Sequence, residues 1–164
     1  MTQRVFITAG AGGIGRVIAQ AYVAQGAQVY VCDQDAAAID ALDANIKGTR
    51  VDVTDEAALD GWLQAGLDLL GGCDVLINNA GIAGQAGPVE DLDLAAWKQC
   101  LAVNLDAQMI TCRTIAPVMK AQKSGVITNL SSTSGLFGAP FRAPYAAAKW
   151  AVIGFTKTIA TELG

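Results

Sequence analysis

Short apolar runs alternate along the chain with longer segments in which apolar residues recur at helical spacing. The runs are rich in Val and Ile, which is typical of strands covered on both faces of a parallel sheet. They predict strands at residues 5–8, 28–32, 49–53, 74–78 and 125–131. The longer segments predict helices at residues 13–25, 35–45, 55–70, 93–120 and 144–163.

The regular alternation of strand and helix also predicts the topology. A strand, a helix and a second parallel strand form a right-handed crossover. Repetition of this unit indicates an α/β fold with a doubly wound parallel sheet in three layers, α/β/α. No repeat, low-complexity tract or Pro/Ser-rich linker interrupts residues 1–164, so we expect a single domain. For the helix at 55–70, Thr54 is the expected N-cap.

The sequence ends directly after the last predicted helix. The strand predicted at 125–131 therefore has no following strand to pair with. That would leave a long apolar edge, which natural proteins usually cover. We expect a chain truncated after its fifth helix, and we expect these 164 residues alone to bind a cofactor weakly and turn over slowly.

Composition narrows the possible partners and the compartment. The formal net charge is −4 and no run of Lys or Arg occurs, which argues against nucleic acid and anionic membranes as partners. No apolar stretch reaches the length of a membrane span, and the N-terminus lacks the features of a signal peptide. The four cysteines are not paired in CxxC motifs and histidine is absent, so we expect reduced thiols, no metal and a cytoplasmic protein.

The segment TAGAGGIG, residues 8–15, lies between the first predicted strand and the first predicted helix. Its glycines satisfy the pattern G-x-G-x-x-G in the context that the pattern requires. Glycines allow close backbone approach, and free N–H groups at the start of a helix can bind a pyrophosphate. The alternative is a glycine-rich turn that binds nothing. The residues predicted to bind the cofactor here are Gly10, Gly12, Gly13, Ile14 and Gly15.

An acidic residue follows the glycine loop at the spacing expected for a ribose-binding carboxylate. Asp33 ends the second predicted strand, 18 residues after Gly15. A carboxylate there accepts hydrogen bonds from the ribose hydroxyls of an adenosine and repels a 2′-phosphate, so NAD is favoured over NADP. No basic residue occurs at 34–38 to favour a phosphate. The alternative is a helix cap or a solvated loop acid, since Asp35 lies nearby.

Together with later motifs, the glycine loop resembles that of the short-chain dehydrogenase/reductase family, and the resemblance extends over essentially all 164 residues. The family pattern T-G-x-x-x-G-x-G matches Thr8 to Gly15 with one departure, because Ala9 stands where the first glycine belongs. Gly10, next to it, offers the flexibility that is lost. The segment NNAG at 78–81 also matches the family, although alone it would be only a turn.

The resemblance implies further cofactor contacts at the carboxyl ends of the strands. Asp52 and Val53 match the positions that meet the adenine ring. Asn79, Ala80 and Gly81 end the fourth strand, beside the crevice where a dinucleotide lies in an open sheet. The family fold is Rossmann-like, in agreement with the strand and helix pattern.

The resemblance also implies a catalytic set. Ser132, Tyr145 thirteen residues later and Lys149 four residues after that hold the family spacing. Asn104 matches the family's helix-four asparagine; the alternative is a mid-helix polar residue that is hydrogen-bonded locally. The neighbouring Ser131 is one residue out of register, and we expect it to be structural.

The chemistry of this set follows from its residue types. A phenol with an ordinary pKa of about 10 is a poor base near neutral pH, but a cation one helical turn away favours its ionised form. Tyr145 beside Lys149 is therefore the expected acid/base, and Ser132 would stabilise charge on the substrate oxygen. By resemblance, Lys149 also holds the nicotinamide ribose, and Asn104 helps to position a water molecule that relays protons.

These residues predict an NAD-dependent alcohol dehydrogenase or ketone reductase. One alternative is a 3-oxoacyl-thioester reductase that uses NADPH, against which Asp33 argues. The other is a non-catalytic nucleotide-binding or scaffold protein, against which the complete catalytic set argues. The segment at 133–144 is expected to line the substrate pocket, as is the segment at 82–91.

Three residues of the 133–144 segment have more than one interpretation. Phe137 and Phe141 would form an apolar wall or belong to the core. Arg142 would meet an anionic substrate or remain a solvated loop residue, and we favour the solvated residue.

The resemblance finally implies a homo-oligomer, because family members commonly pair helices four and five across a two-fold axis. The fifth predicted helix carries small residues that allow a close approach of another helix. A contact within the chain would need the same residues. They are Ala147, Ala148, Ala151 and Gly154.

Overall fold

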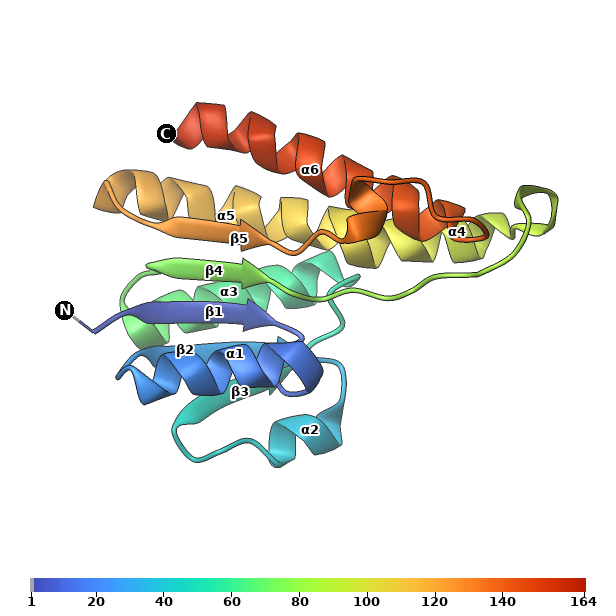
Figure 1. Ribbon diagram of the computed structural model, residues 1–164. Coiled ribbons are helices and arrows are strands. Elements are labelled where there is room, and N and C mark those ends of the chain that lie inside the picture. Colours follow the sequence, from blue (N-terminus) through green and yellow to red (C-terminus); the bar gives the residue numbers. More distant parts are fainter. Residues whose placement is uncertain (1) are drawn as a thin grey trace.

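Five parallel strands form one sheet in the computed structural model, which describes residues 2–164. The strand order is β3-β2-β1-β4-β5, so consecutive crossovers run outward in both directions from β1 and β4 (Figure 1). This arrangement confirms the doubly wound parallel sheet. The strands are β1 (Arg4–Thr8), β2 (Gln28–Asp33), β3 (Ile46–Arg50), β4 (Val75–Asn78) and β5 (Val126–Asn129).

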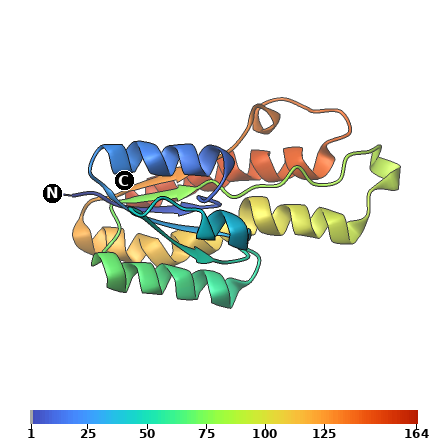
Figure 2. The same cartoon turned by 90° about the horizontal axis from the view of Figure 1, so that it is seen from below.

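Helices cover both faces of the sheet. Helix α1 lies on one face, and α3 and α5 lie on the other, which gives the three layers (Figures 1 and 2). The helices are α1 (Gly13–Ala24), α2 (Ala36–Asp40), α3 (Glu56–Leu70), α4 (Leu94–Leu101), α5 (Ala107–Gln122) and α6 (Ala143–Leu163). Two short 3-10 turns, η1 (Val89–Asp91) and η3 (Thr133–Gly135), and a π-helical segment, η2 (Ala102–Asp106), complete the elements.

Several predicted boundaries were wrong. Strand β3 spans 46–50 and not 49–53, because the sequence IKGTR forms a half-exposed edge strand that lacks the apolar run sought in the sequence. Its early start leaves no room for a helix up to residue 45, so α2 ends at Asp40. The helix predicted at 93–120 is interrupted by the π segment at 102–106. Strand β5 is shorter than the predicted 125–131.

The predicted N-cap of α3 was also wrong by one residue. The cap is Asp55, whose carboxylate accepts a hydrogen bond from the Ala58 N–H at 3.0 Å. The Thr54 hydroxyl instead donates to Asp52 Oδ1 at 2.8 Å. Both Asp and Thr are good caps, and here Thr54 is already engaged with the turn that precedes the helix.

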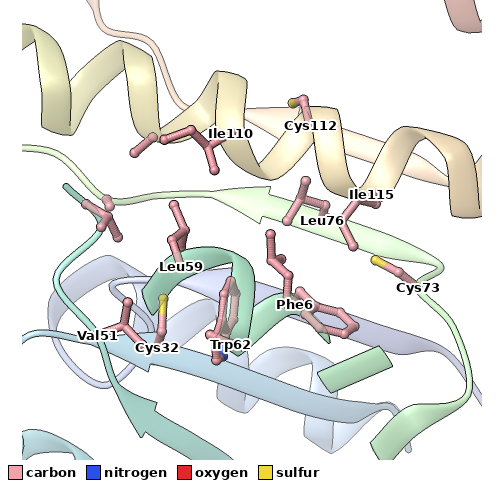
Figure 3. Packing of buried hydrophobic residues seen from close by; sticks show 14 of the residues in the cluster. Phe6, Cys32, Val51, Leu59, Trp62, Cys73, Leu76, Ile110, Cys112 and Ile115 are labelled. Carbon is pink, nitrogen blue, oxygen red and sulfur yellow. The ribbon is translucent and has the colours of Figure 1, made fainter. Parts of the chain in front are cut away.

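The sheet divides the core into two clusters, and strand β1 contributes side chains to both. Val5 and Ile7 point to the α1 side, while Phe6 points to the side of α3 and α5. Figure 3 shows this second side, where Phe6 and Leu76 from the sheet meet side chains of α3 and α5. Alternation of side chains along a strand requires apolar residues at every position when both faces are covered. The sequence of β1 therefore fixes its central place in the sheet.

An aromatic cluster brings α3 close to the sheet. The rings of Phe6 and Trp62 meet edge to face with centroids 5.7 Å apart, and Tyr30 stacks on Trp62 at 5.7 Å. The buried Trp62 Nε1–H donates to the Val31 carbonyl at 3.1 Å, so its polar atom is satisfied. Gly66 completes the contact because a side chain there would lie against Phe6 and 2.5 Å from Tyr30 Cδ1.

The cysteines lie in the core. All four are free and buried, as expected for reduced thiols. Burial raises the pKa of Cys112 to about 11 and that of Cys73 to about 12, so both are neutral thiols near pH 7. Within residues 2–164, no helix combines the length and apolar character needed to cross a membrane.

Strand β5 forms the outer edge of the sheet over residues 2–164. Val126 is 57% exposed on it, and a groove lies between α5, β5 and the end of α6. Figure 1 shows α6 extending beyond this edge.

The packing of α3 predicts opposite effects for two glycines of that helix. We expect Gly66→Ala to lower the free energy of unfolding by about 1–3 kcal/mol, because the methyl group would overlap buried rings. Gly61→Ala has no atom within 4 Å of the added carbon, so it should raise the free energy of unfolding by about 1 kcal/mol through helix propensity. Urea unfolding gives the free energy of unfolding of each variant. Equal changes in the two variants would contradict the close contact at Gly66.

Candidate functional site

The carboxyl ends of β1 and β4 are joined by hydrogen bonds around one buried threonine. Thr8 Oγ1 accepts from the N–H groups of Asn79 and Ala80, each at 3.0 Å. The Asn79 side chain returns two bonds, from Nδ2 to the carbonyls of Thr8 at 3.1 Å and Ala9 at 2.9 Å. The predicted cofactor residue Asn79 thus holds the loop that follows β1. Thr8 was missed from the sequence as a site residue, although its position at the end of a buried strand was a signal.

The glycine loop adopts its turn at an unexpected residue. Ala9 itself has φ +50°, in the left-handed region that usually favours glycine. Gly10, which was expected to supply the flexibility, does not have a positive φ, and its Cα lies against the Val31 side chain. The loop therefore places an alanine in a left-handed conformation, at the expense of local strain.

The outer surface of the loop is open at the start of α1. Side chains at Gly12 or Gly13 would meet nothing within 4 Å, and Ile14 is 67% exposed. Gly15 faces inward, where a side chain would collide with the Ala9 carbonyl and lie 2.7 Å from Asn79 Nδ2. The N-cap Gly12 has no side chain to satisfy the first N–H groups of the helix. These groups are available to an anion.

Asp33 faces this loop from the end of β2. Its carboxylate accepts from the N–H of Ala11 at 3.2 Å and from that of Asp35 at 3.2 Å. The capping role considered for Asp33 belongs instead to Asp35, whose carboxylate accepts from the first turn of α2. Asp33 is therefore held at the mouth of the crevice.

A cleft of about 110 Å³ opens beside Asp33. Its walls come from the ends of four strands and from α4 and η2, and they include the predicted residues Asp52, Val53, Ala80 and Gly81. Val53 is buried, whereas Asp52 is exposed and accepts from the Thr54 N–H at 2.9 Å. The size and the mixed apolar and acidic lining suit the edge of a purine ring.

One arginine, Arg50, is bonded to a residue that lines this cleft, and a second, Arg16, lies on α1. Arg50 pairs with Asp33 in the β2–β3 register, and its Nε–H donates to the Gln34 carbonyl at 3.2 Å. Arg16 donates to the Ala41 carbonyl at 3.1 Å. Inspection of residues 34–38 in the sequence missed Arg50, because it comes from the neighbouring strand.

The side chains of Asn104 and Lys149 both lie close to Gly81. A side-chain carbon on Gly81 would lie 2.9 Å from Asn104 Oδ1 and 3.5 Å from Lys149 Nζ. The glycine therefore allows an amide oxygen and an ammonium group to lie close to the backbone at the end of β4. Asn104 comes from the π segment and Lys149 from α6, so two helices and the end of β4 meet here.

The π segment determines how Asn104 is presented. Its buried Nδ2 donates to the carbonyls of Cys100 and Ile82, both at 2.9 Å. The first bond is the local one that we considered; the second joins the helix to the loop after β4. The Asn104 Oδ1 atom is buried and accepts no hydrogen bond from residues 2–164, so it can accept one from a water molecule or a ligand. π bulges often occur at functional sites.

Tyr145 and Lys149 share one face of α6. Lys149 is 3% exposed, its Nζ donates to the Leu130 carbonyl at 2.7 Å, and it lies 5.7 Å from the centre of the Tyr145 ring. Burial lowers the pKa of Lys149 from its usual 10.5, and the nearby Cys100 opposes this to a smaller extent. No carboxylate among the described residues forms an ion pair with this lysine. An unpaired buried ammonium is costly, which points to a functional reason for it.

The serine pair after β5 has divided roles in the structure. Ser131 Oγ donates to the Lys149 carbonyl at 2.8 Å and so joins the loop to α6, as a structural residue does. Ser132 is half-buried, and its Oγ accepts from the Ser134 N–H at 3.2 Å. The Ser132 hydroxyl is thus free to donate a hydrogen bond.

A chain of polar side chains that the sequence did not predict supports this region. Thr111 donates to Asn78 at 2.7 Å, Asn78 donates to Asn129 at 2.8 Å, and Asn129 donates to Thr156 at 2.9 Å. The chain joins α5, β4, β5 and α6 and satisfies each buried group. It fixes α6, and with it Tyr145, relative to the sheet.

The segment predicted to line the substrate pocket is exposed in part. Phe137 and Phe141 are 70% and 65% exposed, so neither belongs to the core. Arg142 is half-buried, with its Cζ 5.6 Å from the centre of the Tyr145 ring. The predicted cofactor residues lie at the carboxyl ends of β1, β2, β3 and β4, and the predicted catalytic residues lie on η2, on α6 and in the loop after β5.

Comparisons with known proteins identify the family of the chain. The family model described as short chain dehydrogenase matches residues 3–164. A 2-keto-3-deoxy-L-fuconate dehydrogenase from Xanthomonas campestris is 41% identical, over 98% of this chain and 53% of its own. A 2-dehydro-3-deoxy-L-rhamnonate dehydrogenase (NAD(+)) from a Sphingomonas species is 35% identical, over 96% of this chain and 64% of its own.

The fold agrees closely with a solved structure. A short-chain dehydrogenase from Streptomyces avermitilis superposes with a TM-score of 0.92 at 28% identity, covering 99% of this chain and 61% of that one. The chain thus spans between half and two thirds of the length of these relatives. With a family model that matches nearly every residue, the chain belongs to the short-chain dehydrogenase family.

Proposed function

We propose that this protein is an NAD-dependent oxidoreductase that interconverts a secondary alcohol and a ketone. The observation that carries the proposal is the buried, unpaired Lys149 one helical turn from Tyr145, beside the crevice at the ends of β1 and β4. A structural ammonium would be expected to have a carboxylate partner. Here the ammonium faces Gly81 and the amide oxygen of Asn104, and no carboxylate among the described residues pairs with it.

The residues present fit a dinucleotide. The uncapped start of α1 would bind the pyrophosphate through the N–H groups at 12–15, and Asp33 would accept from the adenosine ribose. The cleft lined by Asp52 and Val53 would hold the adenine ring. Gly81 and Lys149 would lie at the nicotinamide end. When bound, the nicotinamide ring supplies the site that accepts or gives the hydride.

The geometry around Asp33 supports NAD over NADP. A 2′-phosphate would have to share the mouth of the cleft with the Asp33 carboxylate, and the two negative charges repel each other. Arg16 is already bonded to the Ala41 carbonyl and lies 3.6 Å from Asp43. Arg50 is the cation nearest to the cleft by register, and it supports the alternative of an NADPH-dependent 3-oxoacyl-thioester reductase.

Proton transfer is assigned to Tyr145. Its deprotonated oxygen would take the proton from the alcohol oxygen as the hydride leaves the carbon, and the resulting hydroxyl would return the proton in the reverse direction. The Lys149 ammonium stabilises the negative charge that forms on the phenol oxygen. Ser132 would donate a hydrogen bond from its hydroxyl group to the substrate oxygen. Asn104, with its unpartnered Oδ1, would hold a water molecule that connects Lys149 to solvent.

The substrate class comes from two sources. The two relatives named above carry sugar-acid substrates in their names, 2-keto-3-deoxy-L-fuconate and 2-dehydro-3-deoxy-L-rhamnonate. The exposed phenylalanines at 137 and 141 add apolar surface to the segment that precedes Tyr145. Both are compatible with a secondary alcohol of modest size.

Two further expectations stay predictions. Self-association through α4, α5 and α6 is supported by the exposure of Trp150 and Met109, which are 51% and 41% exposed. A cytoplasmic location is supported by the four free, buried cysteines.

Replacement of Tyr145 separates cofactor binding from catalysis. The purified protein should bind NADH more tightly than NADPH, and Tyr145→Phe should keep that preference. Turnover of secondary alcohols with NAD should fall by about 10²–10⁴-fold, since the phenol proton is the one transferred. Fluorescence titration with NADH and NADPH gives the binding, and the rate of NADH formation gives the turnover.

The outcomes separate the competing functions. Undiminished turnover by Tyr145→Phe would remove this residue as the acid/base. Binding of NADH without turnover by either protein would favour a nucleotide-binding or scaffold role. Tighter binding of NADPH, lost in Arg50→Gln, would favour the NADPH-dependent reductase.

Lys149 should be unfavourable for stability although the reaction needs it. Because burial lowers its pKa, the charged form costs folding free energy at every pH below that folded-state pKa. Lys149→Met should therefore raise the free energy of unfolding by about 1 kcal/mol near pH 7, despite the lost bond to Leu130, while it abolishes turnover.

The pH dependence tests the cause. As pH rises through the lowered pKa towards 10.5, the wild-type lysine loses its charge and the advantage of Lys149→Met should shrink. The matched control is Lys157→Met, an exposed lysine of α6, which should change stability by less than about 0.5 kcal/mol. A destabilised Lys149→Met would show instead that the lysine is structural.

A further inference from the structure

Arg142 differs from every other arginine of the chain. Its guanidinium forms no hydrogen bond or ion pair with any of residues 2–164. The other four each donate to a protein oxygen: Arg4 to Asp74, Arg16 to Ala41, Arg50 to Gln34 and Arg113 to Asp60. Arg142 is nevertheless half-buried, against the face of the Tyr145 ring. Five N–H donors are thus held at the proposed acid/base without an acceptor.

The backbone before Arg142 is held in a strained conformation. Phe141 has φ +61°, which is uncommon for an aromatic residue. Its carbonyl accepts from the Gly87 N–H at 3.0 Å, so the loop after β4 is joined to the turn. The Phe141 side chain is largely exposed and gains little from this conformation. The strain fixes the start of α6, where Arg142 is the N-cap residue.

Two cations flank the same aromatic ring. Arg142 Cζ lies 5.6 Å from the centre of the Tyr145 ring, and Lys149 Nζ lies 5.7 Å from it. The ring attracts each cation, so two positive charges lie at the proposed acid/base. No carboxylate within residues 2–164 forms an ion pair with either of them. A bound anion would supply the counter-charge that the described residues do not provide.

We propose that Arg142 binds the carboxylate of the substrate, and that the substrate is therefore a hydroxy acid or its oxo acid. This inference rests on the proposed function, because it concerns the molecule that reacts at Tyr145. A guanidinium is always charged and can donate two parallel N–H bonds to a carboxylate. Contact with the Tyr145 ring places that carboxylate only a few bonds from the reacting carbon.

The carboxylate takes no part in bond changes. In the proposed reaction the hydroxyl proton would pass to the deprotonated oxygen of Tyr145 and a ketone would form, while the nicotinamide cofactor would supply the acceptor for the hydride. The carboxylate remains ionised throughout and serves only to orient the carbon. Arg142 is accordingly a residue that sets specificity, and its loss should affect acids and spare neutral alcohols.

Matched probes test this assignment. We use 3-hydroxybutanoate and its neutral counterpart 3-hydroxybutanamide, with the wild-type protein, Arg142→Gln and Arg142→Lys. The purified protein should prefer the acid. Arg142→Gln should lower kcat/KM for the acid by about 10- to 100-fold and that for the amide by less than about 3-fold. Arg142→Lys should fall between, since it keeps the charge but loses the two-pronged geometry. Lys157→Gln, which removes an exposed charge from α6, should leave both values unchanged.

A binding measurement separates this inference from the proposed function. Calorimetric titration of 3-hydroxybutanoate into the protein, with and without NADH, involves no reaction. The acid should bind, and its Kd should rise by about 10- to 100-fold in Arg142→Gln. If it binds in this way but nothing turns over, the anion site stands and the oxidoreductase proposal fails. If neutral alcohols turn over while the acid binds no better, or Arg142→Gln binds it equally well, the carboxylate site is wrong and the oxidoreductase proposal stands.

Discussion

The burial of one ammonium group is the constraint on which the rest of the site depends. Lys149 is almost completely removed from water and is bonded to the Leu130 carbonyl, at the point where β5 ends. Ser131 returns a bond to the backbone of the same lysine, so the loop and the helix hold each other. Desolvation makes this arrangement unfavourable for stability. It is understandable as the means of placing a positive charge beside Tyr145, where the proposed chemistry develops a negative one.

The scaffold brings the two halves of the sheet to that charge through polar contacts. Thr8 joins the ends of β1 and β4, which places the glycine loop next to Gly81. The chain from Thr111 through Asn78 and Asn129 then connects β4 to β5 and to α6. Each group in these contacts is satisfied by another, which makes the arrangement rigid and unique. The cofactor end and the acid/base end of the crevice are thereby held in one frame.

The sheet and the pairing of Tyr145 with Lys149 could be predicted from the sequence. Unbroken Val/Ile runs set the buried strands, and the spacing of Tyr145 and Lys149 on one helix survives any error in helix boundaries. Features decided by tertiary contacts could not be predicted. The left-handed φ of Ala9 depends on the loop around it, and the inward turn of the Asn79 amide depends on β1. The ring contact of Arg142 depends on a hydrogen bond between two loops, so a solvated arginine was the natural expectation.

Isotope transfer tests the central claim most directly. The purified protein is incubated with NAD and a secondary alcohol, 3-hydroxybutanoate, that carries deuterium on the alcohol carbon. Mass spectrometry then measures the isotope content of the reduced cofactor. The account predicts NADH that carries deuterium, because the hydride passes directly from carbon to the nicotinamide ring. Reduced cofactor without deuterium, or no reduced cofactor with any secondary alcohol tried, would contradict it.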